Sequence, residues 1–306
     1  MRMKPNAAWG RTGLRSSPLI YGCMRVADPA KARAAVLAAW EAGYRHFDHA
    51  DIYGRGACEQ VFGDLLRQTP SLRREEMLLT SKVGIRFAGD PNPNSPKRYD
   101  FSADWIRRSC EGSLRRLGVE TLDCYLLHRP DVLMDPGEVA AVFQELHRAG
   151  KVRTFGVSNF TPAQVEALRA ALPFPLACHQ IELHPARLAP FTDGTLTQCQ
   201  ALGMTPTAWS PVHRGLFGEG GAVPENHPRR DELRALTAAM DEIAAGLGAT
   251  RATLTLAWLM AHPAGVQPIV GSTDPRRIAE AARALDVRMD RETWYRIYAL
   301  AGGPLP

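Results

Sequence analysis

The stretch at residues 34–54, AAVLAAWEAGYRHFDHADIYG, contains the pattern that decides the fold. An amphipathic run over Ala30–Ala42 stops at Gly43, and a short apolar segment follows at Arg45–Phe47. A glycine directly after a helix suits the left-handed conformation that ends many helices, because it has no Cβ. A helix, a glycine and then a buried strand is typical of βα units and of a parallel sheet.

The same order recurs along the chain. Three more amphipathic runs, Trp105–Leu117, Glu138–Ala149 and Leu196–Leu202, are each followed by glycine and an apolar segment. The candidate strands are Leu19–Cys23, His46–His49, Met77–Lys82, Leu122–Leu127, Thr154–Ser158, Cys178–Glu182, Thr205–Ser210 and Val266–Val270. Eight such strands with helices between them predict an α/β fold, a single-domain (β/α)8 TIM barrel over residues 1–306. A doubly wound open sheet is the alternative, although no G-x-G-x-x-G follows the first strand.

Composition narrows the class of protein. The 306 residues carry 37 Lys+Arg against 32 Asp+Glu, a net charge of +5, with 45% apolar and 23% charged residues. These values are ordinary for a globular chain and exclude a collagen-like or disordered one. No apolar run approaches the roughly 18–20 residues of a membrane span, and the apolar stretch Leu19–Met24 is too short for an export signal.

The distribution of basic residues and cysteines indicates which partners and which location to expect. No dense basic run with interleaved aromatic residues appears, so we expect no nucleic-acid binding. The six cysteines have no C-x-x-C spacing and several lie in apolar segments, which favours reduced thiols and a cytoplasmic location. We expect a monomer or weak homo-oligomer that acts on a small molecule.

Polar residues end or follow seven of the predicted strands. In a (β/α)8 barrel the active site lies at the carboxyl ends of the strands. The residues in question are Asp48 and Tyr53, Ser81 and Lys82, His128, Ser158 and Asn159, Gln180 and Glu182, Trp209 and Ser210, and Gly271 and Ser272. Each alone has an ordinary explanation, such as a turn cap for Asp48 or a hydrogen-bonded core histidine for His128. Together they predict one active site at the mouth of the barrel.

Lys82 is the most informative of these residues. A lysine that closes an apolar strand must be paired, because an unpaired buried ammonium is destabilising by several kcal/mol. Asp48, at the neighbouring strand end, is the expected partner. An ammonium lowers the pKa of a nearby phenol from its usual value near 10, so Lys82 beside Tyr53 predicts a general acid. His128 can orient a carbonyl oxygen or assist the proton transfer.

Five motifs in this order resemble the aldo-keto reductase superfamily, in its bacterial general oxidoreductase branch. They are Gly43–Gly54, Leu79–Lys82, Leu122–Pro130, Gly156–Phe160 and His179–Glu182. The resemblance implies reversible, NADPH-dependent reduction of aldehydes or ketones to alcohols. Tyr53 would be the proton donor, tuned by Lys82 and Asp48, and His128 would orient the substrate.

The resemblance also assigns cofactor contacts. Ser158, Asn159 and Gln180 match the residues that hold the nicotinamide carboxamide, and Trp209 matches a ring stacked on the nicotinamide. The remaining expected contacts are Gly22, Cys23, Met24, Ser210, Arg214, Gly215, Leu216, Phe217, Gly271, Ser272 and Arg277. Ser272 and Arg277 would bind the adenosine 2′-phosphate. Gly271 stands where some members have lysine, and Ala281 where an amide is common, so the grip is weaker than in those members. We expect NADPH, with NADH binding more weakly.

Two other functions remain open at this point. One is a metal-dependent hydrolase on the same barrel, because His46, Asp48, His49 and Asp51 are clustered and His128 and His184 lie near other strand ends. Alternation along a strand separates His49 from His46 and Asp48, and Lys82 repels a cation, so we expect no metal. The other is a non-catalytic NADP-binding redox sensor, since catalytic residues can persist in one.

Arg129, directly after His128, also has two interpretations. It either contacts an anionic or strongly polar substrate, or it pairs with Asp131 or Asp51 on the rim. We expect the pairing.

Overall fold

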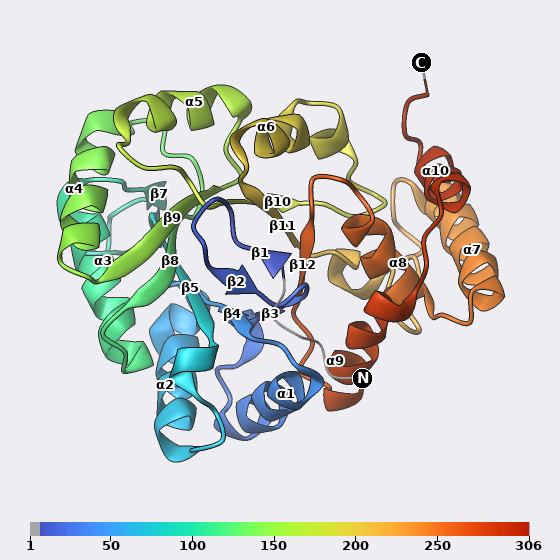
Figure 1. The fold of residues 1–306 in the computed structure, drawn as a ribbon, viewed down its shortest axis with the longest axis horizontal. Helices are drawn as coiled ribbons and strands as arrows, with labels where there is room; N and C mark the ends of the chain where they lie inside the picture. The colour runs from blue at the N-terminus through green and yellow to red at the C-terminus, as the bar shows by residue number, and fades with distance from the viewer. Residues whose placement is uncertain (1–6, 306) are drawn as a thin grey trace.

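The centre of the protein is a closed barrel of parallel strands. The computed structural model describes residues 7–305, and its barrel has the order β10-β11-β12-β3-β4-β5-β8-β9 (Figure 1). These strands are β3 (Ile20–Gly22), β4 (His46–Asp48), β5 (Leu78–Val83), β8 (Leu122–Leu127), β9 (Val152–Ser158), β10 (Cys178–Glu182), β11 (Thr205–Trp209) and β12 (Gln267–Val270). The predicted barrel is confirmed, and the open sheet is wrong.

Helices join successive strands and surround the barrel (Figure 1). They are α1 (Pro29–Ala42), α2 (Ala57–Gln68), α3 (Ala103–Leu117), α4 (Pro136–Arg148), α5 (Pro162–Ala171), α6 (Thr195–Leu202), α7 (Arg230–Gly246), α8 (Arg251–Met260), α9 (Pro275–Ala282) and α10 (Arg291–Leu300). Local sequence sets their ends. In α1, the Asp28 side chain accepts the N–H of Lys31 and Pro29 opens the first turn, while Gly43 ends the helix at φ 97°. Both are standard end signals.

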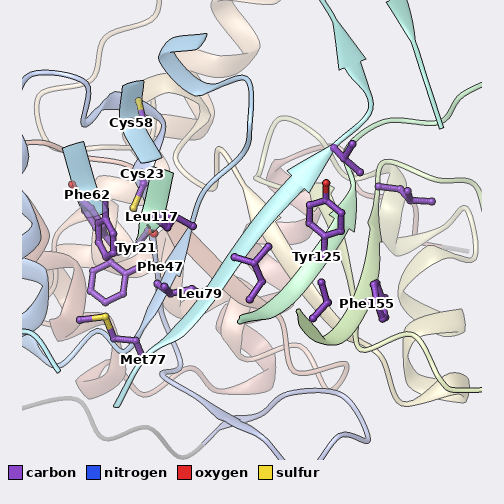
Figure 2. Close-up of a cluster of buried hydrophobic side chains, with 14 of the residues drawn as sticks. Tyr21, Cys23, Phe47, Cys58, Phe62, Met77, Leu79, Leu117, Tyr125 and Phe155 are labelled. Atoms are coloured by element: carbon purple, nitrogen blue, oxygen red, sulfur yellow. Dashed lines mark hydrogen bonds between the residues drawn. The ribbon is translucent and has the colours of Figure 1, made fainter. Parts of the chain in front are cut away.

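Alternation along the strands separates the side chains that face the barrel interior from the apolar side chains that face the helices. Tyr21, Phe47, Leu79, Tyr125 and Phe155 belong to the buried apolar layer between barrel and helices (Figure 2). Successive side chains on a strand point to opposite faces. Asp48, one position after Phe47, and Lys82, three positions after Leu79, therefore face the interior.

This alternation corrects one prediction. Ser81 does not reach the mouth of the barrel, because its Oγ donates a hydrogen bond to Glu59 Oε1 on α2 at 2.6 Å. It lies on the outer face of β5, one residue from Lys82.

A hairpin of β1 (Ala7–Ala8) and β2 (Arg15–Ser16) fills the amino-terminal end of the barrel (Figure 1). Trp9, in its turn, is buried and packs edge-on against His46 with ring centroids 4.6 Å apart. The Gly10 N–H donates to Thr205 Oγ1 at 2.8 Å. Because this hairpin closes the amino-terminal end of the barrel, an active site has to lie at the carboxyl ends of the strands.

The loop at residues 86–99 forms a second hairpin, of β6 (Ile85–Arg86) and β7 (Arg98–Tyr99). Arg86 ties it together through ion pairs to Asp90 at 2.7 Å and Asp100 at 2.9 Å.

Within residues 7–305, no single helix has both the length and the apolar character to cross a membrane. The pair α7 and α8 satisfies the length and composition criteria only together, across an 88° bend.

A helix glycine tests the packing of α2 on α3. A Cβ on Gly63 would lie 2.3 Å from the backbone oxygen of Arg116. Alanine normally stabilises a helix relative to glycine, by about 0.5–1 kcal/mol. We expect Gly63→Ala to lower the free energy of unfolding instead, by about 1–3 kcal/mol, because the helices must separate. Urea unfolding followed by circular dichroism measures it.

The control for this substitution is Gly246→Ala at the last residue of α7, where a Cβ meets nothing within 4 Å. It should leave stability unchanged or raise it. Equal effects of the two substitutions would contradict the packing.

Candidate active site

The ammonium of Lys82 lies at the centre of the site. The residue has no exposed surface. Its Nζ donates to Asp48 Oδ2 at 2.6 Å, to the His49 carbonyl at 2.7 Å and to Tyr53 Oη at 3.1 Å. An ammonium has three N–H donors and no acceptor, so all three are used. The Tyr53 oxygen therefore accepts from Lys82, and its own hydrogen is left to be donated elsewhere.

Strand register brings Asp48 and Lys82 together. Asp48 on β4 is level with Thr80 on β5, so Lys82 is the next residue on the same face. The other oxygen of Asp48 accepts from Gln180 Nε2 at 2.9 Å. Because β10 lies opposite β4 in the strand order, this bond crosses the barrel. Both carboxylate oxygens of Asp48 are thus held.

The protonation states suit a proton donor. Burial alone would lower the pKa of Lys82, but Asp48 and Tyr53 outweigh it and raise that pKa above its ordinary value. Burial raises the pKa of Tyr53, and Lys82 offsets only part of that rise. Lys82 thus lowers the pKa of the phenol as expected, but burial outweighs this effect and the net pKa of Tyr53 is raised. At neutral pH the pair is an ammonium beside a protonated phenol.

His128 lies beside Tyr53 just after the end of β8. The two rings meet edge to face, with centroids 5.9 Å apart at 81°. Burial, with Lys82 and Arg129 adding to it, lowers the pKa of His128 well below its usual value, so the imidazole is neutral. Its Nδ1 is buried and has no hydrogen-bond partner among residues 7–305. The site thus presents a phenol hydrogen and a neutral imidazole side by side.

A chain of hydrogen bonds joins three strand ends across the mouth. The Trp209 indole N–H donates to Asn159 Oδ1 at 2.9 Å. The Asn159 amide donates to Ser158 Oγ at 2.7 Å and to the His128 carbonyl at 3.2 Å. The structure brings together the residues predicted for the carboxamide, with their amides already bonded within the protein.

The loop after β11 has an unusual backbone. Ser210 and Arg214 adopt left-handed conformations with φ of 52° and 56°, and Gly215 has φ 102° with open space at its Cβ position. Leu216 and Phe217 are buried, so their backbone is what they can offer a ligand. Arg214 is exposed.

The turn after β3 contributes mostly backbone. Gly22 and Cys23 are buried, and the Cys23 thiol contacts the Tyr21 carbonyl at 3.8 Å. Met24, in contrast, is 55% exposed.

The turn after β12 offers cationic side chains. Ser272 Oγ accepts the N–H of Asp274 at 3.1 Å, and Gly271 is exposed with nothing near its Cβ position. Asp274 caps α9 and pairs with Arg276 at 3.3 Å. Arg277 is exposed, and no carboxylate of residues 7–305 lies within ion-pair distance of it. The Asp274 carboxylate thus occupies the helix end, and Arg277 remains available.

Arg129 does not make the ion pair that we expected. Asp131 accepts the N–H groups of Phe101 and Leu133, and Asp51 accepts from Ser109 Oγ at 2.7 Å. The Arg129 guanidinium instead lies 5.6 Å from the Trp209 ring centroid. It is half-buried and has no ion pair to a carboxylate in the described part of the chain.

Of the residues considered for a hydrolase metal site, His46, Asp48 and His49 do not converge. His46 bonds Ser16 Oγ at 3.0 Å and Thr80 Oγ1 at 2.7 Å, inside the barrel. His49 packs on Phe62 outside it, with centroids 4.6 Å apart. Both oxygens of Asp48 already accept hydrogen bonds, from Lys82 and from Gln180.

A supporting ion pair was not predicted. Glu59 is wholly buried and bridges Ser81 and Arg116, with the Arg116 Nη2 at 2.7 Å. It braces the outer face of β5 behind Lys82. The available signal was Glu59 on the apolar face of an amphipathic helix, which requires a partner.

Comparison with known proteins agrees with this geometry. The sequence model of the Aldo/keto reductase family matches residues 18–301. The chain belongs to this family. It is therefore an oxidoreductase of the NAD(P)H-dependent aldo-keto reductase type.

Relatives cover nearly the whole chain. It is similar to a 6-dehydroglucose reductase of Novosphingobium aromaticivorans, 41% identical over 96% of this chain and 94% of the relative. A 6-dehydroglucose reductase of Agrobacterium fabrum is 35% identical over 95% and 96%. A solved thermostable aldo-keto reductase in complex with the inhibitor epalrestat is 28% identical, with a TM-score of 0.80 over 95% of this chain and 98% of its own.

The buried pair makes a stability prediction. Lys82→Met removes the ammonium and leaves the Asp48 carboxylate unpaired, so we expect a loss of about 3–5 kcal/mol of unfolding free energy. The double variant Lys82→Met/Asp48→Asn removes the stranded charge and should be more stable than Lys82→Met alone. Urea unfolding of wild type, Lys82→Met, Asp48→Asn and the double variant measures the coupling energy between the two residues. Strictly additive effects on the free energy of unfolding would argue against the pair.

Proposed function

We propose that this protein reduces an aldehyde or ketone to an alcohol with NADPH, and that Tyr53 supplies the proton. The observation that carries the proposal is the use of all three Lys82 N–H donors, one of them on Tyr53 Oη at 3.1 Å. This bond leaves the phenol hydrogen directed away from Lys82.

The residues at the mouth fit a nicotinamide dinucleotide. The half-buried Trp209 ring offers a stacking face, and the Asn159 and Gln180 amides match the donors and acceptors of a carboxamide. The turn at Arg214–Gly215, with its open Cβ position, lets backbone approach a pyrophosphate. When bound, the reduced dinucleotide supplies the hydride.

The chain's own residues handle the oxygen of the substrate. The carbonyl oxygen accepts the Tyr53 O–H, and His128 beside it orients the same oxygen. As negative charge develops there, Tyr53 gives up its proton, and the phenolate left behind is stabilised by the Lys82 ammonium. Asp48 holds that ammonium in place throughout. A protonated phenol at neutral pH matches the reductive direction.

A preference for NADPH over NADH would depend on side chains that bind the 2′-phosphate. Because the Asp274 carboxylate caps α9, the helix end itself is a poor site for a phosphate. Arg277 and Ser272 are the groups that we propose for the 2′-phosphate.

We also propose an aldehyde of the sugar type as substrate. Two relatives are named 6-dehydroglucose reductases. In this chain, the Arg129 guanidinium, 5.6 Å from the Trp209 ring centroid, provides donors for hydroxyl or other polar oxygens of such a substrate.

The reaction is tested by following NADPH oxidation with sugar-derived, aromatic and small aliphatic aldehydes. Tyr53→Phe should lower kcat by about 10²- to 10⁴-fold, as expected for loss of a general acid. NADPH binding, followed by tryptophan fluorescence, should persist. Tyr295→Phe, at an exposed tyrosine of α10, is the matched control.

Two outcomes count against the proposal. Equal turnover by wild type and Tyr53→Phe would remove Tyr53 as the acid. Tight NADPH binding with no turnover of any aldehyde would favour the redox sensor.

The cofactor preference has its own prediction. Arg277→Gln should raise the KM for NADPH by about 10-fold or more, since a charge-assisted hydrogen bond contributes about 1.5–3 kcal/mol. The KM for NADH should stay the same. Arg276→Gln, at the neighbour that pairs with Asp274, is the control. Equal changes for both cofactors would show that Arg277 does not read the 2′-phosphate.

A further inference from the structure

We propose that Glu182, His184 and His213 form a binding site for a divalent transition-metal ion of the zinc type. Glu182 is the last residue of β10, and His184 follows two residues later. His213 comes from the loop after β11. The site is separate from the Lys82–Tyr53 pair, and the proposed reduction does not depend on it.

The three ligand atoms are already close together. His213 Nδ1 lies 3.1 Å from His184 Nε2, and His184 Nε2 lies 3.5 Å from Glu182 Oε1. All three atoms are within 4.8 Å of one another. Around a tetrahedral zinc ion with bonds of about 2.1 Å, neighbouring ligand atoms are about 3.4 Å apart. Small side-chain adjustments would therefore complete three coordination positions.

The donor set selects a class of metal. Two imidazole nitrogens and one carboxylate oxygen suit Zn²⁺, Ni²⁺ or Cu²⁺ better than Mg²⁺ or Ca²⁺, which prefer all-oxygen sites. The six cysteines are all buried, and none belongs to this cluster. A thiolate site is therefore not a competitor among the described residues.

Two features limit the affinity. The Ala186 N–H donates to His184 Nδ1 at 3.2 Å, so the ring proton of His184 lies on Nε2, facing His213. A metal ion on Nε2 requires this proton to move to Nδ1, which costs the ring its hydrogen bonds from Ala186 and to His213. The charged or titratable groups that act on the two rings are Glu182, Arg187, Arg214, His227 and Arg229. Since one of them is acidic and three are arginines, we expect micromolar rather than nanomolar binding.

The ion would connect two segments far apart in sequence. The His184 and His213 rings already lie 4.3 Å apart, and Phe217 packs at 6.3 Å from each. His213 holds this position with a left-handed backbone at φ 44°. A shared metal ion would fix the loop after β11 to the end of β10.

Metal binding is measured on chelator-treated, tag-free protein. Calorimetric titration with Zn²⁺ at pH 8 should give one equivalent bound. Co²⁺ as a probe should give the visible bands of tetrahedral coordination, without the charge-transfer band that a thiolate produces. Zn²⁺ should also raise the melting temperature of the wild type.

Variants locate the site. His213→Gln should weaken Zn²⁺ binding by more than about 100-fold, because even changes outside the ligand shell weaken binding by about 10- to 100-fold. Glu182→Gln tests the site from β10. His147→Gln, at an exposed histidine of α4, is the matched control and should bind like wild type.

The proposal is overturned if the wild type binds no Zn²⁺ at pH 8, or if His213→Gln and Glu182→Gln, both folded by circular dichroism, bind as well as the control. An octahedral Co²⁺ spectrum shared by wild type and variants would equally reject it. These readouts are binding and spectra, so they stand whether or not the protein reduces aldehydes.

Discussion

A buried ammonium imposes the main constraint on this molecule. Lys82 has no exposed surface, and each of its three N–H groups needs an acceptor inside the protein. An unpaired charge at this depth is destabilising by several kcal/mol. Asp48, the His49 carbonyl and Tyr53 supply the acceptors. The need to satisfy the ammonium therefore also fixes where the phenol oxygen lies and which of its hydrogen-bonding functions stays free for a substrate.

Strand alternation lets the same segments serve chemistry and packing. On β5, Lys82 faces the barrel while Ser81 binds Glu59 in the helix layer. At the end of β4, Asp48 faces Lys82, while the next residue, His49, packs on Phe62 of α2. Because neighbouring residues point to opposite faces, displacing one disturbs the other. The Glu59–Arg116 ion pair behind β5 thus supports the geometry of a residue that it does not touch.

The mouth of the barrel is held together before any ligand binds. Trp209, Asn159 and the His128 carbonyl form a continuous chain across β11, β9 and β8, and Gln180 reaches across to Asp48. The amides proposed for the carboxamide are thus bonded within the protein. A ligand that offers an amide replaces one polar partner with another of the same kind, so the exchange is nearly balanced in hydrogen bonds. Rigid placement of these groups favours a single orientation of the nicotinamide ring that we propose to bind here.

Sequence alone predicted the barrel and singled out Asp48, Tyr53, Lys82 and His128 as the centre of the candidate site. Helix-glycine-strand repeats and polar strand ends are local signals, and the pairing of Lys82 with Asp48 follows from the instability of a lone buried charge. Sequence did not predict that the net pKa of Tyr53 is raised or that Ser81 points away from the barrel interior. It also did not predict that Arg129 lacks an ion pair with Asp131 or Asp51, or that His213 contacts His184. Each of these depends on burial, or on contacts between residues remote in the chain. Only closure of the sheet sets how deeply a group is buried and which distant side chains face it, so the tertiary structure had to decide them.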